Sequence, residues 1–241
     1  MSYRLSVFAF FLIKVFSPMS DLWLLLFDCD GTLVDSETLI VEAMMMAFQR
    51  AHMAPPDRSA IRRIIGLSLP LAIEALGVPA NKGLVNEIGA NYKAAYAELR
   101  DERGLVEPLF AGVSGLISTL RGEEHVLLGI ATGKTRKGVN SLLSGLGWLD
   151  HFQTIQTSCS APSKPHPAMI EQAMRETGVR ADRTLMIGDT TFDMEMAQNA
   201  GTLAIGVTWG HHFREDLAAF NPQHIVGDMA ELKEVLYGFI S

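Results

Sequence analysis

Two aspartates, one residue apart, follow the first strongly apolar segment of the chain. The segment covers residues 22–27, and Asp28 and Asp30 come directly after it. Alternate residues of an extended chain point to the same side, so the two carboxylates can converge on one point. Carboxylates held close together repel each other, and a hard divalent cation that prefers oxygen ligands would offset this repulsion. The spacing therefore favours a Mg²⁺ site where this segment ends.

The residues around the two aspartates have structural interpretations of their own. Gly31 allows the backbone to turn sharply, and Thr32 can hydrogen-bond locally to hold the turn. Asp35 and Ser36 are predicted to cap the helix that follows. The side chain of Cys29 is expected to point away from both carboxylates and to pack as a small hydrophobic group.

Three more apolar segments also end at polar residues. Residues 126–131 end on Thr132, residues 185–187 end on Gly188 and Asp189, and a weaker segment covers 202–207. Uninterrupted apolar segments of this length are typical of strands buried on both faces of a parallel sheet. Helical patterns lie between them, at 113–120, 135–146, 167–177 and 192–199. This alternation predicts an α/β fold with a Rossmann-like, doubly wound parallel sheet, which binds ligands at the carboxyl ends of its strands.

One part of the chain interrupts the alternation. Between residues 36 and 107 only helical candidates occur, at 38–52, 59–65, 70–76 and 81–103. Gly77, Pro79 and the pair Pro55-Pro56 separate them. We therefore predict a core domain made of residues 21–35 and 108–241, with a helical cap domain of residues 36–107 inserted after the first strand.

The amino-terminal residues 1–20 carry a short apolar run, residues 7–13, that Lys14 ends. A membrane-spanning helix needs about 20 apolar residues, so no membrane span is predicted. Three interpretations remain. An over-long start, with the working protein beginning near Met19, is favoured over a disordered or surface-associated extension, and an export signal is the least favoured.

Composition excludes several classes of protein. The chain has 241 residues, a formal charge of −7, and no cluster of Lys and Arg, which argues against nucleic acid as a partner. The two cysteines, Cys29 and Cys159, are too few for a disulfide framework, so a cytoplasmic location is expected.

His211 and His212 could bind a metal as a pair, but a loop position beside the site is the preferred interpretation. A monomer or a homodimer is expected.

The D-x-D-G-T-x-x-D pattern of residues 28–35 resembles the first motif of the haloacid dehalogenase superfamily of phosphatases and phosphomutases. Thr132 matches the second motif, Lys164 the third, and Asp189 with Asp193 the fourth, in the order the family requires. The resemblance extends over residues 22–207. Within the superfamily, the sequence is similar to the phosphoglycolate phosphatase-like branch. This similarity implies an α-helical cap inserted after the first motif.

This resemblance implies a role for each catalytic residue. Asp28 would be the nucleophile that attacks phosphorus and forms an aspartyl phosphate. Asp30 would protonate the leaving alcohol and later activate water. An ordinary aspartate has a pKa of about 4, so we expect the neighbouring carboxylates to raise the pKa of Asp30. Lys164 would supply the cation that the phosphoryl group and Asp28 both need.

The resemblance also implies ligands for the phosphate and for Mg²⁺. Thr132 and the backbone N–H of Gly133 would hold phosphate oxygens. Asp189, the carboxylate of Asp28 and the backbone carbonyl of Asp30 would hold the metal ion. Asp193 and Thr32 are expected to support this site from behind the direct ligands, Asp193 by orienting Lys164 or the waters on the metal.

The cap offers two groups of cationic residues. Arg63 and Ser68, in a helix followed by a G-x-S motif, are predicted to bind substrate together with the neighbouring Arg62, although a solvated basic face is almost as favourable an interpretation. Lys93 and Arg100 are predicted to face solvent on a later helix. The family's caps carry substrate-specificity loops near the first of these groups.

Together these features predict a Mg²⁺-dependent phosphatase that acts on a small phosphorylated metabolite similar to phosphoglycolate. Alternatives within the superfamily are an inorganic pyrophosphatase, a sugar-phosphate phosphatase and a phosphomutase. An alternative of another class is a receiver-like signalling module that is phosphorylated on aspartate. Receivers lack a second aspartate two residues on and a helical insert, so Asp30 discriminates against that alternative.

Overall fold

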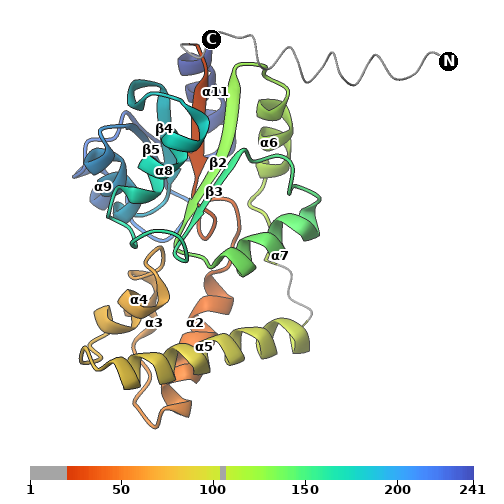
Figure 1. Cartoon of the computed structure of the whole chain (residues 1–241). Helices are drawn as coiled ribbons and strands as arrows, with labels where there is room; N and C mark the ends of the chain where they lie inside the picture. Colours follow the sequence, from red (N-terminus) through yellow and green to blue (C-terminus); the bar gives the residue numbers. More distant parts are fainter. Residues whose placement is uncertain (1–20, 104–106) are drawn as a thin grey trace, which may run out of the picture.

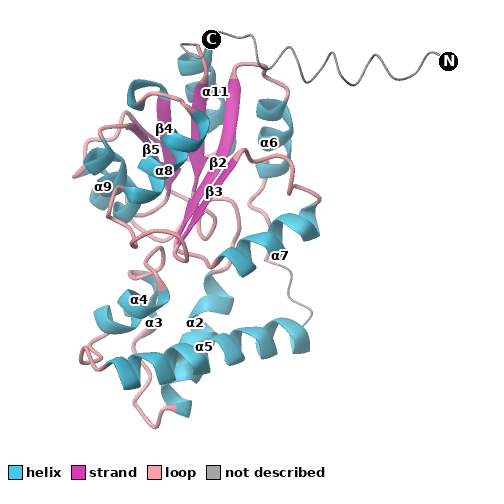
Figure 2. Ribbon diagram, in the orientation of Figure 1, coloured by secondary structure: helices cyan, strands magenta, loops and turns pink. Residues whose placement is uncertain are grey.

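The computed structural model describes residues 21–103 and 107–241, and the predicted extension of residues 1–20 lies outside the described residues. Six parallel strands form one sheet in the order β3-β2-β1-β4-β5-β6 (Figure 2). This confirms the predicted α/β fold with a parallel sheet. The strands are β1 (Trp23–Phe27), β2 (Val126–Thr132), β3 (Thr154–Thr157), β4 (Thr184–Gly188), β5 (Leu203–Val207) and β6 (His224–Val226).

Helices cover both faces of the sheet. On one face α6 (Val113–Arg121), α7 (Arg136–Leu146) and α11 (Met229–Ile240) pack with alternate residues of the strands. On the other face lie α8 (Ala168–Thr177), α9 (Thr191–Ala200) and α10 (Arg214–Ala218), and the 3-10 turn η1 (Ala181–Arg183) precedes β4. In β1, Leu25 belongs to the first core and Leu24 to the second. Burial on both faces explains why the strand sequence has no polar break.

The sequence patterns missed two strands and two α-helices, besides the short η1. Strand β3 has the sequence TIQT and β6 has three residues, and both are too short and too polar to stand out as apolar segments. They form the two edges of the sheet. Helix α11 left a clearer signal, because its buried residues recur every four positions after Asp228, whose side chain accepts the N–H groups of Ala230 and Glu231. Helix α10 has five residues and a single buried apolar side chain.

Four helices form a separate body beyond the carboxyl ends of the strands (Figure 1). They are α2 (Glu37–Arg50), α3 (Arg58–Arg62), α4 (Leu69–Ala75) and α5 (Lys82–Arg103). Buried apolar residues of these helices pack against each other and not against the sheet. We propose the sequence-derived bounds, 36–107, as the limits of this cap domain. Among the described residues, no helix is long and apolar enough to cross a membrane.

A tight turn follows β1. The backbone N–H groups of Thr32, Leu33 and Val34 all point to the carbonyl oxygen of Cys29. Gly31 has a φ of 85°, and a Cβ atom there would lie 2.2 Å from Asp189 Oδ2, so both the backbone angle and the space require glycine. Cys29 is fully buried in the apolar core, as the sequence predicted.

Candidate active site

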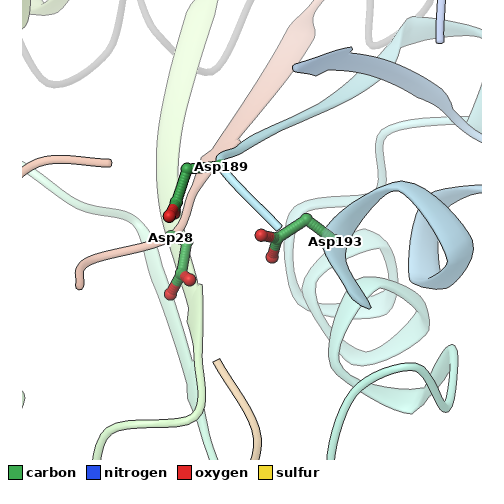
Figure 3. A group of neighbouring side chains, drawn as sticks. All are labelled: Asp28, Asp189 and Asp193. Atoms are coloured by element: carbon green, nitrogen blue, oxygen red, sulfur yellow. The ribbon is translucent and has the colours of Figure 1, made fainter. Parts of the chain in front are cut away.

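The strand order locates the candidate site, because the direction in which successive strands are added reverses between β1 and β4. In doubly wound sheets, ligands bind in the crevice at such a reversal. Asp28 follows β1, Asp189 follows β4, and Thr132 ends the neighbouring strand β2. Figure 3 shows Asp28 and Asp189 side by side, with Asp193 of α9 pointing toward them. The fold therefore gathers polar residues that lie more than 150 positions apart in the chain.

Lys164 is completely buried between two of these carboxylates. Its Nζ lies 2.9 Å from Asp28 Oδ2 and 2.5 Å from Asp193 Oδ1. Burial raises the pKa of Asp28 to about 7, with Lys164 opposing the rise and Asp193 and Asp189 adding to it. For Lys164 burial alone would lower the pKa, but the two carboxylates outweigh it and raise the pKa. Lys164 is thus a fixed positive charge at the centre of the site.

Asp193 is held rigidly by the start of α9. Its Oδ2 accepts hydrogen bonds from Thr190 Oγ1 at 2.7 Å and from the Thr190 backbone N–H at 3.1 Å. The bond from the Thr190 N–H is one half of a capping box, in which the Thr190 side chain in turn accepts the backbone N–H of Asp193. Since its other oxygen contacts Lys164, Asp193 stands in a geometry suited to the orienting role proposed for it.

Asp189 is surrounded by hydrogen-bond donors from two distant loops. Thr32 Oγ1 donates to Asp189 Oδ1 at 2.8 Å, so Thr32 contacts the end of the neighbouring strand and does not bond only within its own turn. The backbone N–H of His211 donates to Asp189 Oδ2 at 2.9 Å, and His211 Nδ1 lies 2.7 Å from the same oxygen. The sequence placed His211 in a loop beside the site but missed this direct contact. His212 instead contacts the backbone N–H of Thr191, at 3.1 Å.

The carboxylates of Asp28, Asp189 and Asp193 fit a bound cation. Each offers one oxygen, and these oxygens lie within 4.8 Å of one another. All three residues are fully buried, and one lysine balances only part of their charge. Asp28 Oδ2 has Lys164 Nζ at 2.9 Å as its charged partner, and that same lysine also serves Asp193. Burial of carboxylates whose charge is only partly balanced is costly, so a divalent cation ligated by oxygen atoms suits this cluster.

The carboxylate of Asp30 does not join this cluster. Its Oδ1 accepts hydrogen bonds from Lys134 Nζ at 2.8 Å and from Ser36 Oγ at 2.6 Å. Burial alone would raise the pKa of Asp30, but these contacts outweigh it and lower the pKa. The predicted rise in the pKa of Asp30 is therefore wrong, because the nearest charge is a lysine. Ser36 occupies the N-cap position of α2, yet its hydroxyl bonds to Asp30 and makes no capping bond.

Lys134 connects Asp30 to the cap. Its Nζ also lies 2.8 Å from Glu107 Oε1, and it sits 5.7 Å from the centre of the Tyr96 ring on α5. The Tyr96 hydroxyl donates to the same Glu107 oxygen. The sequence analysis predicted no role for Lys134, which follows Thr132 and Gly133 in the second motif, and no pattern indicated Glu107. The network that they form was not predictable, since Asp30, Tyr96, Glu107 and Lys134 come from four separate segments.

The second motif lies directly under the cap. Thr132 is buried, and its hydroxyl accepts the backbone N–H of Lys134 at 3.3 Å. A Cβ atom on Gly133 would lie 2.5 Å from the carbonyl oxygen of Gly66 and 2.8 Å from that of Leu67. Glycine is therefore required for the turn between α3 and α4 to approach this closely. Between cap and core lies a cavity of about 500 Å³ that Asp28, Asp30 and Thr132 line.

Comparison with known proteins identifies the family. The model of the haloacid dehalogenase-like hydrolase family matches residues 25–207. The chain belongs to the haloacid dehalogenase-like hydrolases. This match extends from β1 to β5 and includes all four motifs, so the resemblance stated from the sequence is confirmed.

Several curated relatives of this hydrolase are phosphatases by name. The "Probable phosphatase IndB" of Dickeya dadantii is 39% identical over 87% of this chain and 91% of its own length. Pyrophosphatase PpaX of Anoxybacillus flavithermus is 32% identical, covering 88% and 95%. Phosphoglycolate phosphatase of Pectobacterium atrosepticum is 28% identical, covering 86% and 89%. The chain thus shares most of its length with members of the family that are named as phosphatases.

The fold agrees with solved structures of the family. A haloacid dehalogenase-like hydrolase from Streptococcus pneumoniae superimposes with a TM-score of 0.75 at 27% identity, over 90% of this chain and 99% of that one. The helical body and the parallel sheet therefore form a known combination. Membership of this family excludes the receiver-like signalling module as an alternative.

The cap residues that line the cavity differ from those predicted to bind substrate. Arg63 and Ser68 are not among the described residues that line the cavity. The backbone carbonyl of Arg63 contacts His212, and the backbone N–H of Ser68 donates to Ser163 Oγ at 2.7 Å. These two residues thus fasten the cap to the core. Arg62 pairs with Glu37 of α2 at 3.0 Å, also away from the cavity.

The cations that do line the cavity from the cap are Lys93 and Arg100 of α5. Both side chains are exposed, as predicted, but they stand at the edge of the cavity. Their position depends on how α5 lies across the carboxyl ends of the strands, which helical periodicity within one segment could not indicate.

Affinity for Mg²⁺ is expected to depend on pH in a defined direction. Because the pKa of Asp28 is raised to about 7, its carboxyl is protonated below that pH and must lose the proton to bind a cation. The dissociation constant should therefore rise as pH falls, by up to about tenfold per pH unit below 7. Calorimetric titration of the metal-free protein with Mg²⁺ at pH 6 and pH 8 measures this. Equal affinities at the two values would contradict it.

Proposed function

We propose that this hydrolase is a phosphatase, a Mg²⁺-dependent phosphomonoesterase that works through an aspartyl phosphate on Asp28. One observation carries the proposal: Asp28 directly follows β1, and its buried Oδ2 lies 2.9 Å from Lys164 Nζ. This ion pair holds the oxygen in place at the floor of the cavity and leaves it available as a nucleophile. Its other oxygen, Oδ1, accepts the backbone N–H of Cys29 at 2.7 Å, which fixes the rotation of the carboxylate.

In the first displacement, an oxygen of Asp28 forms a bond to phosphorus while the bond from phosphorus to the ester oxygen breaks. Asp30 gives a proton to the departing alcohol. Asp30 is ionised in the structure, because Lys134 lowers its pKa. A phosphate dianion brought close to Asp30 disfavours its ionised form, so substrate binding favours the proton that the leaving group needs.

The second displacement releases phosphate. Asp30, now ionised and held by Lys134 and Ser36, takes a proton from a water molecule that attacks the aspartyl phosphate. The bond between Asp28 and phosphorus breaks, and the Asp28 carboxylate is restored. Lys164 would stay beside the Asp28 carboxylate and the phosphoryl group in both displacements, and Asp193 keeps Lys164 in position.

Phosphate oxygens would be held by Thr132 and by the backbone N–H of Gly133, which lie next to Asp28 along the edge of the cavity. Asp28, Asp189 and the backbone carbonyl of Asp30 would hold Mg²⁺. The ion would neutralise charge on the transferring phosphoryl group. Asp189 is prepared for this by its contacts with Thr32 and His211, which fix the carboxylate.

The names of the relatives suggest two substrates for comparison, 2-phosphoglycolate and pyrophosphate. We favour an organic phosphomonoester over pyrophosphate, because the cavity continues well beyond Asp28 into the apolar cap. A phosphomutase must protect its aspartyl phosphate from water, and no described residue serves that purpose specifically. A sugar phosphate remains within the proposed class.

Trapping the covalent intermediate tests the mechanism. Replacing Asp30 with Asn removes the base that activates water, so the aspartyl phosphate should accumulate. Intact-mass measurement after mixing Asp30→Asn with Mg²⁺ and 4-nitrophenyl phosphate, whose leaving group needs no proton from Asp30, should show the added mass of one phosphoryl group, located on Asp28 by peptide mapping. A phosphoryl group on any other residue would contradict the mechanism.

The role of Lys134 can be read from the pH dependence. Replacing Lys134 with Met removes the cation that lowers the pKa of Asp30, and burial then raises it. Since the base must be ionised, the acidic limb of kcat should move to higher pH in the variant. Lys134 would be a positioning residue, and a fall in kcat without any displacement of this limb would contradict that role.

A further inference from the structure

The cavity between cap and core is larger than a phosphoglycolate-like substrate requires. Its volume is about 500 Å³, and its floor carries Asp28, Asp30 and Thr132. Pockets of about 300–1,000 Å³ typically enclose ligands of drug size, whereas phosphoglycolate has only about nine non-hydrogen atoms. Resting on the phosphatase function proposed above, we infer that the natural leaving group is a bulky, flat, apolar group that carries an anionic substituent at the end farthest from the phosphate.

The walls of the cavity supply the apolar part of this inference. Apart from the floor, the cap contributes mainly aliphatic and aromatic side chains. Tyr92 and Tyr96 of α5 are one helical turn apart, with ring centres separated by 5.8 Å. Aliphatic neighbours come from α2, from α4 and from the turn before α4, and they include Ile40, Met44, Leu67, Leu69 and Ala72. A polar two-carbon leaving group would leave these surfaces in contact with water, while an aromatic ring would cover them.

The rim of the cavity carries unneutralised positive charge. Lys93 and Arg100 of α5 and Lys137 of α7 line it, and all three side chains are exposed. Among the residues that the structure describes, Lys93 and Lys137 form no ion pair, and Arg100 has only its neighbour Asp101 at 3.9 Å. The acids that line the cavity are Asp28 and Asp30, both on the floor. In a chain with a net charge of −7, a rim of cations favours an anionic group at this end.

The spacing along α5 gives the rim its shape. Lys93, Ala97 and Arg100 follow one another at intervals of four and three residues, so they share one face of the helix. With a rise of about 1.5 Å per residue, Lys93 and Arg100 lie about 10 Å apart along the axis. The small side chain of Ala97 between them leaves the space open. Helix α7 lies opposite this part of α5 (Figure 1).

The cap can hold such a substrate without moving away from the core. The turn before α4 is fastened to the core by the hydrogen bond from Ser68 N–H to Ser163 Oγ and by the close approach of Gly66 to Gly133. Neither contact involves α5 or α7, which carry the cationic rim. A long leaving group can therefore extend between α5 and α7 while the turn remains closed over the phosphate.

Three alkyl phosphates with similar leaving-group basicity test the inference: ethyl phosphate, 2-phenylethyl phosphate and 2-(4-carboxyphenyl)ethyl phosphate. With the full chain and Mg²⁺, kcat/KM should rise about 10- to 100-fold from the first to the second, because a ring becomes buried. The carboxylate should add about a further tenfold. Ethyl phosphate or 2-phosphoglycolate hydrolysed as efficiently as 2-phenylethyl phosphate would overturn the inference and leave the phosphatase function intact. Hydrolysis of none of them would overturn the phosphomonoesterase function itself.

Variants locate the effect. In the double variant Lys93→Ala with Arg100→Ala, the preference for the carboxylated ester over 2-phenylethyl phosphate should fall from about tenfold to about one. Lys82→Ala, at the start of the same helix and outside the cavity, is the matched control and should keep the preference. Ala97→Trp fills the rim and should reduce the preference for 2-phenylethyl over ethyl phosphate. If the double variant kept the preference for the carboxylated ester, Lys93 and Arg100 would not be the groups that bind the carboxylate.

Discussion

Replacing Asp28 with Asn is expected to reduce phosphate release by at least about 10⁴-fold, because the amide cannot attack phosphorus and no other described side chain is placed to do so. The substitution keeps the shape of the side chain. Its Oδ1 can still accept the Cys29 N–H, so the turn after β1 should stay intact. Phosphate release in the presence of Mg²⁺ measures the loss, and peptide mapping should detect no phosphoryl group on residue 28.

A surface aspartate offers a matched control for Asp28→Asn. Asp182→Asn changes an aspartate in η1 that pairs with Arg180 on the surface, at 2.6 Å, and it should retain full activity. Lys164 keeps its second partner, Asp193, in Asp28→Asn, so the variant should remain folded. Activity within tenfold of the wild type in a folded Asp28→Asn protein would contradict the nucleophilic role of Asp28.

Replacing Lys164 with Met is expected to damage both stability and catalysis. The side chain is fully buried between Asp28 and Asp193, and its removal leaves two buried carboxylates without their cation. Breaking a buried pair in this way costs about 3–5 kcal/mol in the free energy of unfolding. Loss of a positive charge beside the transferring group should also lower kcat by about 10²- to 10³-fold. Urea unfolding and steady-state kinetics measure the two effects separately.

The stability loss in Lys164→Met should itself depend on pH. Without the lysine, burial raises the pKa of Asp28 further, because only the weaker effect of the Thr132 hydrogen bond still opposes the rise. A group whose pKa is raised on folding destabilises the protein as pH rises from its unfolded value toward its folded value. The difference from the wild type should therefore be smaller at pH 5 than at pH 8. Lys82→Met, an exposed change on α5, is the control, and an equal loss at both pH values would contradict the explanation.

The sequence by itself determined the family, the parallel sheet and the residues of the four motifs. Strands β1, β2 and β4 are buried on both faces, so their apolar segments have no polar break and end abruptly at Asp28, Thr132 and Asp189. Their shared orientation follows from the rule that parallel strands place their carboxyl ends at one edge. Helical periodicity likewise indicated α2, α4 and α5. These features are local, and a pattern in one segment is enough to show them.

Contacts between distant segments were decided only by the tertiary structure. The pKa of Asp30 is lowered because Lys134, at the end of β2, reaches it at 2.8 Å, and the sequence offered only the neighbouring carboxylates as a cause. Thr32 and His211 meet at Asp189 for the same reason. The side of the cap that faces substrate also depends on packing. Arg63 and Ser68 contact the core, while Lys93 and Arg100 reach the cavity, because the angle of each helix is set by its partners and not by its own residues.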